Sequence, residues 1–160
     1  MQASRKPWVS ECVLAAACCA VAPVQAASLC TPDEPVVFAC HVGSKLVSLC
    51  RSAGDRGMLS YRFGKPDSVE LRYPDPGQQA GAAFTVKSAP LVGGGETTVA
   101  FRRGAYTYTV YSKVARGADG VSPEFEDGVI VSRRGKVLSR MRCEDGGEGF
   151  REPVAAVAVK

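Results

Sequence analysis

Apolar and polar residues alternate along Thr97–Ser112, and this pattern predicts a β-hairpin in the second half of the chain. Gly104 can adopt the positive φ that a tight two-residue turn requires, which places the turn at Arg103–Gly104. In that register Phe101 faces Tyr106, and all the large apolar residues share one face of the hairpin. This face carries Val99, Phe101, Tyr106, Tyr108 and Val110, whereas the opposite face carries Ala100, Thr107 and Thr109.

The same alternation, interrupted by Gly, Pro, Asp and Ser turn signals, predicts more short strands on both sides of this hairpin. No stretch has the pattern of a long helix. Eight or nine short strands of this kind predict an all-β domain, either an antiparallel β-sandwich or a closed barrel. The other expected strands are Val36–Val42, Lys45–Arg51, Met58–Phe63, Val69–Tyr73, a weak strand Ala83–Lys87, Val129–Ser132 and Lys136–Arg142, the last two turning at Arg134–Gly135.

Residues 1–26 have the pattern of a secretory signal peptide: two basic residues, the apolar stretch Val13–Val24, and small residues before a cleavage point after Ala26. A lipoprotein signal ending at Cys18 is the alternative, but Leu14 lies one residue too far from that cysteine. The prediction is a protein exported to the periplasm, with secretion beyond it as the other destination. Residues 27–160 then form one domain, whose tail 144–160 either frays or docks as an edge segment.

Four cysteines remain after residue 26, which in an exported chain predicts two disulfides. On adjacent strands of one hairpin, Cys40 and Cys50 lie about 10 Å or more apart, beyond disulfide reach. Two pairings stay open: Cys30–Cys40 with Cys50–Cys143, which we favour, and Cys30–Cys50 with Cys40–Cys143. A four-thiolate zinc site is the other reading, but the chain has no C-x-x-C pair in this region.

Charge and motifs point away from several functional classes. Loss of the signal peptide lowers the formal net charge from +4 to +3, and the basic residues are scattered, so we expect no nucleic-acid partner. The apolar end of the tail is too short for stable membrane insertion. His41 is the only histidine and is expected as an ordinary strand residue, so no metal, cofactor or catalytic residue is predicted. A hydrolase would need acids that converge in a pocket.

The tip of the predicted hairpin carries Arg102, Arg103, Gly104 and Tyr106. Arginine and tyrosine dominate the energetics of many protein interfaces, and a projecting cationic tip suits an acidic cleft such as that of a glycosidase. The alternative interpretation is a surface turn whose arginines only maintain solubility. These four residues are therefore the candidate partner-binding site.

Four segments resemble a group of small exported proteobacterial β-proteins that includes the periplasmic inhibitors of I-type lysozyme. They are V-F-A-C-H-V-G-S-K-L-V-S-L-C at 37–50, Y-R-F-G-K-P at 61–66, V-E-L-R-Y-P at 69–74 and F-R-R-G-A-Y-T-Y-T-V-Y at 101–111. The resemblance implies a β-sandwich that inserts an S-G-x-Y loop into the lysozyme cleft. Here Arg103 stands in place of the serine, and Gly104 and Tyr106 match the motif.

This resemblance implies a non-enzymatic protein-binding module whose partner is a lysozyme. Arg103 would pair with a catalytic carboxylate of the lysozyme, Tyr106 would fill a sugar subsite, Gly104 would permit the turn, and Arg102 would flank the cleft. The alternative function is an envelope-associated structural or interaction protein of unknown partner, without inhibitory activity.

Overall fold

The computed structural model describes residues 27–53, 57–78, 84–144 and 148–154, so the predicted signal peptide lies outside the described residues. Within these ranges the chain forms nine strands, and no helix there is long and apolar enough to cross a membrane. The strands are β1 Val36–Val42, β2 Lys45–Arg51, β3 Leu59–Lys65, β4 Ser68–Tyr73, β5 Phe84–Leu91, β6 Gly94–Arg103, β7 Tyr106–Arg116, β8 Pro123–Arg133 and β9 Lys136–Arg142.

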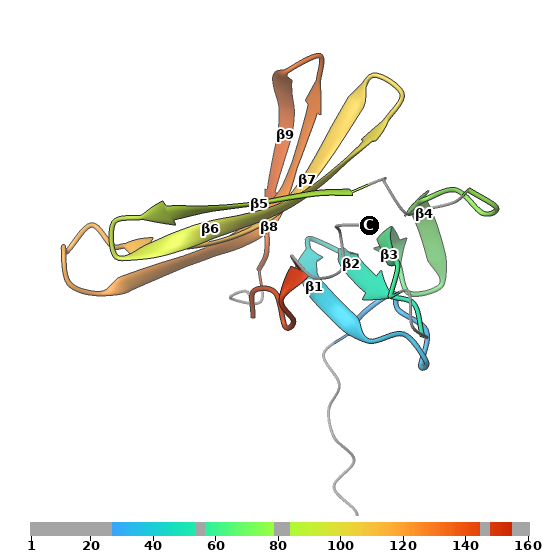
Figure 1. The fold of residues 1–160 in the computed structure, drawn as a ribbon, viewed down its shortest axis with the longest axis horizontal. Coiled ribbons are helices and arrows are strands. Elements are labelled where there is room, and N and C mark those ends of the chain that lie inside the picture. The colour runs from blue at the N-terminus through green and yellow to red at the C-terminus, as the bar shows by residue number, and fades with distance from the viewer. Residues whose placement is uncertain (1–26, 54–56, 79–83, 145–147, 155–160) are drawn as a thin grey trace, which may run out of the picture.

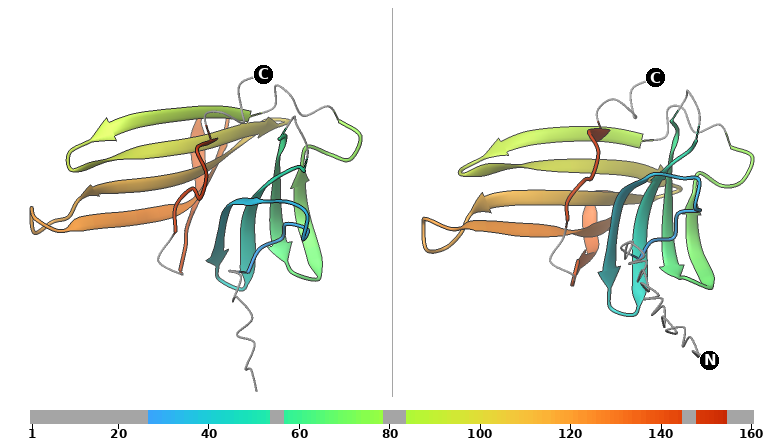
Figure 2. Two further views of the ribbon diagram at one scale, coloured as in Figure 1. Left: turned by 60° about the horizontal axis from the view of Figure 1, so that its bottom comes forward. Right: turned by 90° about the horizontal axis from the view of Figure 1, so that it is seen from below.

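The strands form two antiparallel sheets, each made of consecutive hairpins (Figure 1). The smaller sheet has the order β1-β2-β3-β4 and the larger sheet the order β5-β6-β7-β8-β9. The sheets pack face to face with their strands running crosswise (Figure 2), which is one of the two usual arrangements of a sandwich. The predicted all-β sandwich is confirmed. The closed-barrel alternative is wrong, because each sheet ends in unpaired edge strands instead of continuing into the other.

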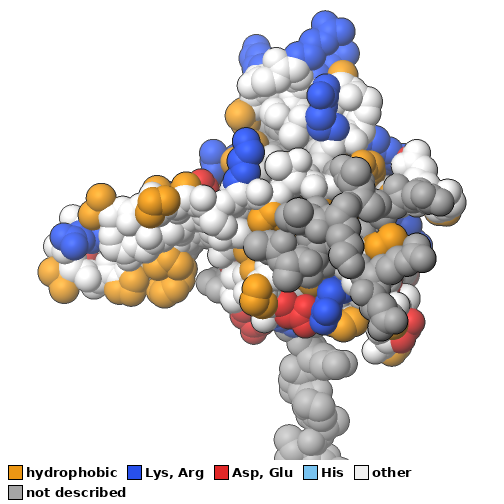
Figure 3. Space-filling model, viewed as in Figure 1, with side chains coloured by type: hydrophobic (Ala, Val, Ile, Leu, Met, Phe, Trp, Pro, Cys, Tyr) orange, Lys and Arg blue, Asp and Glu red, His pale blue; other side chains and the backbone are white. Residues whose placement is uncertain are grey.

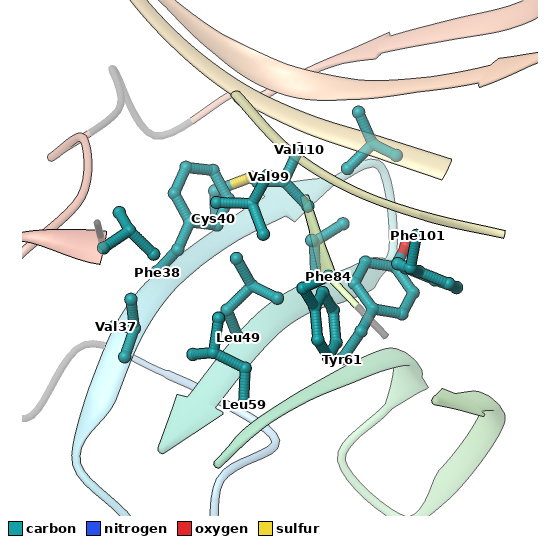
Figure 4. Packing of buried hydrophobic residues seen from close by; sticks show 13 residues of the cluster. Val37, Phe38, Cys40, Leu49, Leu59, Tyr61, Phe84, Val99, Phe101 and Val110 are labelled. Atoms are coloured by element: carbon teal, nitrogen blue, oxygen red, sulfur yellow. The ribbon is translucent and has the colours of Figure 1, made fainter. Parts of the chain in front are cut away.

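The core lies between the two sheets, where the inward side chains of β1–β3 meet those of β5–β8 (Figure 4). Phe101 of β6 is its central aromatic residue, since its ring lies against four others. The rings of Tyr73 and Tyr108 stack on it at centroid distances of 4.2 Å and 5.0 Å. The Tyr61 ring is tilted against it at 4.9 Å, and the Phe84 ring meets it edge-on at 5.5 Å. These contacts fix the β6–β7 hairpin on the smaller sheet.

The central hairpin has the predicted faces but a different turn. Phe101 pairs with Tyr108 instead of Tyr106, and the turn lies at Gly104–Ala105, one residue later than predicted. When the turn moves by one residue, the partner of each strand residue moves by two positions along the other strand. Side chains two positions apart share a face, so every side chain stays on its face. The alternation of polar and apolar residues therefore cannot distinguish the two registers. The observed register stacks Phe101 on Tyr108 within the core. Gly104 has a φ of 60°, as the turn prediction required.

The disulfides join Cys30 to Cys50 and Cys40 to Cys143, so the favoured pairing is wrong and its alternative is right. Cys40 is the strand partner of Val47, and both side chains lie in the core. Cys50 is separated from Val47 by an odd number of positions along β2, so its side chain projects from the opposite face of the smaller sheet. Cys143, which follows β9 of the larger sheet, can reach only the inward face. The zinc alternative is wrong as well, because all four thiols are oxidised.

The segment before β1 lies over the outward face of the smaller sheet. The amide of Leu29 donates to the Ser48 hydroxyl at 2.9 Å, and Arg62 donates to the Leu29 carbonyl at 2.7 Å. Arg62 also makes two hydrogen bonds to Glu34, at 2.6 Å and 2.7 Å. Because Ser48 and Arg62 are both buried, these polar contacts satisfy groups that water cannot reach.

The described part of the tail docks against the free edge of β1. Glu144 donates its amide to the His41 carbonyl at 3.0 Å, and Arg151 donates its amide to the Val37 carbonyl at 2.9 Å. The Phe150 ring lies 5.3 Å from that of Phe38, and Val154 is buried in the core.

Candidate functional site

Two hairpin turns lie side by side at one end of the larger sheet, away from the β5–β6 and β7–β8 turns (Figure 1). One is the turn between β6 and β7, and the other is the turn between β8 and β9. Tyr106 pairs with Arg133 across β7 and β8, and the Arg134 amide donates to the Ala105 carbonyl at 3.3 Å. We call residues 102–106 and 133–136 together the paired tips.

The structure brings two of the four predicted contact residues together. Arg103 and Tyr106 are strand partners, so they lie on the same face of the β6–β7 hairpin next to its turn. Arg102 projects from the other face, and Gly104 forms the turn itself. Tyr106 lies on the inward side of the sheet but beyond the core, with 37% of its surface exposed. It is therefore accessible to a partner.

The paired tips concentrate positive charge (Figure 3). They hold five cations, and the one carboxylate paired with them is Asp75, which accepts a hydrogen bond from Arg103 at 2.8 Å. Both members of that ion pair are more than 40% exposed. The guanidinium carbon of Arg133 lies 5.5 Å from the centre of the Tyr106 ring, a cation–π distance. Among the described residues, no acid pairs with the other four cations, which are Arg102, Arg133, Arg134 and Lys136.

Sequence reasoning missed the β8–β9 half of this site, although the sequence contains a signal for it. The tripeptide Arg-Arg-Gly occurs at 102–104 and again at 133–135, and both copies fall on hairpin turns. The segments 97–112 and 128–142 together contain seven Lys or Arg residues and no acid. An antiparallel order β6-β7-β8-β9 brings alternate turns to the same end of a sheet, so both copies must lie together.

A polar cluster on the outward face of the larger sheet supports the β8–β9 hairpin. The Tyr111 hydroxyl donates to Glu126 at 2.7 Å, and the Arg140 guanidinium carbon lies 5.4 Å from the centre of the Tyr111 ring. Burial, followed by the hydrogen bond to Glu126, raises the pKa of Tyr111, so its hydroxyl keeps its proton as a donor. Glu126 also pairs with Arg142 at 3.2 Å. The missing side chain of Gly128 makes the space for the Tyr111 ring.

Other groups that could carry chemistry have structural partners. Glu34 and Asp75 line a pocket of about 230 Å³, but each carboxylate is held by an arginine. His41 lies on the exposed side of β1. No group of three or more His, Cys, Asp or Glu side chains within the described ranges is arranged to hold a metal ion.

The acids in the described part of the tail do not converge on a site either. Glu144 accepts the Gly43 amide at 2.9 Å, and Glu148 pairs with Arg151. Comparison with protein-family models, with curated proteins and with solved structures found no match for this chain.

Proposed function

We propose that this chain is an exported, non-catalytic binding protein that inhibits a lysozyme of the I type by placing the paired tips in its active-site cleft. The observation that carries the proposal is the charge of the paired tips: they hold five cations and no acid, only Arg103 pairs with a carboxylate of the described chain, and an accessible tyrosine lies beside them. The two disulfides fit an oxidising compartment outside the cytoplasm. The choice of lysozyme as the partner comes from the resemblance of the β6–β7 segment to the inhibitors.

A glycosidase cleft is chemically complementary to this surface, because it carries a pair of carboxylates flanking the scissile bond. The planar guanidinium of Arg103 can bind one carboxylate through two parallel hydrogen bonds. To do so it exchanges Asp75 for the carboxylate of the partner. This exchange costs little, since an exposed ion pair contributes only about 0–1 kcal/mol.

Tyr106 supplies the apolar part of the contact. Its ring is held by Arg133 on one side and is more than a third exposed, so it can pack in a sugar subsite without a large loss of side-chain entropy. Arg133 and Arg134 extend the positive surface onto the second turn. They steer the module towards an acidic cleft, and this effect weakens as salt is added.

The test is a cell-wall lysis assay with I-type, C-type and G-type lysozymes, each mixed with the purified chain from residue 27 onward. We expect inhibition of the I-type enzyme. Replacing both Arg103 and Tyr106 by Ala should abolish it while the circular dichroism spectrum and thermal midpoint stay unchanged. Interface residues of this kind contribute about 2 kcal/mol or more each, or about 30-fold in Kd.

The matched control is Arg116→Ala, which removes one exposed cation at the opposite end of β7 and should leave inhibition intact. Retained inhibition by the Arg103→Ala/Tyr106→Ala variant would show that the paired tips are not the contact site. Absence of inhibition of all three lysozyme types by the wild-type protein would remove the proposed function.

A further inference from the structure

A groove of about 590 Å³ lies over β5, β6 and β7 of the larger sheet. Most of its lining side chains project from the outward face, where the strand register places them in short rows across the sheet, and Tyr73 of β4 and Phe101 complete the lining. Ala100 lies at the centre, between Thr85 on β5 and Thr109 on β7. The hollow exists because this alanine is flanked on all sides by longer side chains.

Threonine hydroxyls form most of the polar wall of this groove. Thr98 donates weakly to the Lys87 carbonyl at 3.5 Å. The hydroxyls of Thr85, Thr107 and Thr109 make no side-chain hydrogen bond to another residue within the described part of the chain. They are therefore available to donate to, and accept from, a bound molecule.

The two charged side chains that line the groove, Lys87 and Arg102, are both cations. Lys87 lies at its β5 side and Arg102 at its end towards the paired tips, and neither pairs with an acid of the described chain. Two rows of strand partners continue across the sheet to β9, where they end in Arg140 and Arg142, and both of these arginines pair with Glu126 of the neighbouring row. These rows contain no acidic residue: they are Thr85–Ala100–Thr109–Ile130–Arg140 and Lys87–Thr98–Tyr111–Gly128–Arg142.

We infer that this groove binds an acidic saccharide, that is, a sugar chain bearing carboxylate or phosphate groups. The threonine hydroxyls match the hydroxyls of the sugar rings, and the two cations at the ends of the groove match the acidic groups. A cation without a partner beside an open polar hollow is better placed for an anionic ligand than for a neutral one. This site shares Arg102 with the paired tips, but Lys87, Ala100 and Thr109 lie outside them, so the two contacts can be tested separately.

The experiment is a titration of the protein from residue 27 onward with three probes, followed by calorimetry and by the amide shifts of Thr98, Ala100 and Thr109. The probes are a galacturonate hexamer for carboxylate, a glucosamine disaccharide with two phosphates for phosphate, and an uncharged galactose hexamer. We expect one of the two acidic saccharides to bind and the uncharged hexamer not to bind. Whichever acidic probe binds identifies the anionic group.

Two variants locate the site. Ala100→Gln fills the hollow from an outward-facing position and should weaken binding at least tenfold, and Lys87→Gln should weaken it at least fivefold. Lys65→Gln is the matched control, because it removes the same charge at the exposed end of β3 in the smaller sheet. Lysozyme inhibition should be the same in all three variants, so the two proposals can fail separately.

Three results would overturn the inference. The first is that neither acidic saccharide binds at millimolar concentration. The second is that Lys65→Gln weakens binding as much as Lys87→Gln, which indicates attraction to net charge alone. The third is that a single-stranded oligonucleotide of equal charge binds as tightly and shifts the same amides, which indicates a general polyanion surface.

Discussion

The buried ion pair between Glu34 and Arg62 allows a quantitative test of how the segment before β1 is held. Arg62 is only 5% exposed, and its guanidinium makes both of its bonds to Glu34 below 2.8 Å. Glu34→Gln leaves the size of the side chain unchanged but removes its charge and one of its two acceptors. The guanidinium then stays buried without a counter-ion, because its third bond goes to the neutral carbonyl of Leu29.

The expected loss of stability is about 3 kcal/mol. A hydrogen bond to a charged group contributes about 1.5–3 kcal/mol, and breaking one partner of a buried pair typically costs about 3–5 kcal/mol. For a domain of about 130 residues this lowers the thermal midpoint by about 10 °C. Urea unfolding of the wild type, Glu34→Gln, Arg62→Met and the double variant would measure the loss and the coupling between the two residues.

Acid provides an independent check of the same contact. Burial raises the pKa of Glu34, but the hydrogen bonds from Arg62 and Thr31 outweigh it, so the pKa lies below its ordinary value of 4.5. A carboxyl with a lowered folded-state pKa stabilises the fold above its unfolded pKa, and this contribution is lost as the pH falls through the folded value. The wild type should therefore lose stability below about pH 4.5 more steeply than Glu34→Gln does.

The control is Glu70→Gln, which breaks an exposed pair with Lys45 and should cost less than about 1 kcal/mol. The reasoning is refuted if Glu34→Gln costs no more than this control. It is also refuted if the effects of Glu34→Gln and Arg62→Met simply add in the double variant, since two residues in direct contact should be coupled.

Two further predictions concern cross-links and packing. Peptide mapping by mass spectrometry should find Cys30–Cys50 and Cys40–Cys143, and removing the second should cost more, since its 103-residue separation exceeds the 20 residues of the first. The loop-entropy difference is about 1.4 kcal/mol, so equal thermal midpoints for the two double-serine variants would contradict it. Gly128→Ala should cost about 1–3 kcal/mol in urea unfolding, because its methyl group would collide with the Tyr111 ring and a backbone carbonyl.

The sequence predicted which face each strand residue occupies better than which residue it pairs with. The faces of Phe101 and Tyr108 follow from a period of two, which any shift by an even number of residues preserves. The choice between pairing Phe101 with Tyr106 or with Tyr108 depends on which ring stacks in the core, and that requires the other sheet. The same parity separates Cys40 and Cys50 onto opposite faces, but it does not say which of them reaches Cys143, because that depends on which face packs against the larger sheet.

Half of the candidate site followed from the sequence. The β6–β7 tip was identified from its local composition, and its exposed tyrosine and arginines lie where a partner can reach them. The contribution of Arg133 and Arg134 depends on the order of strands in the sheet, which no local pattern reveals. The Arg103–Asp75 contact likewise joins residues from the two sheets, so it depends on how they pack.

The docking of the tail on β1 has a consequence for how the chain completes its fold. The amides of Glu144 and Arg151 occupy carbonyls on an edge that would otherwise be open to strand addition by another molecule. These contacts join residues more than a hundred positions apart, so they form late in synthesis, and until then the first strand is a site for aggregation. The last segment of the domain therefore protects the edge of its first strand, and that edge is most exposed to aggregation before this segment has been synthesised.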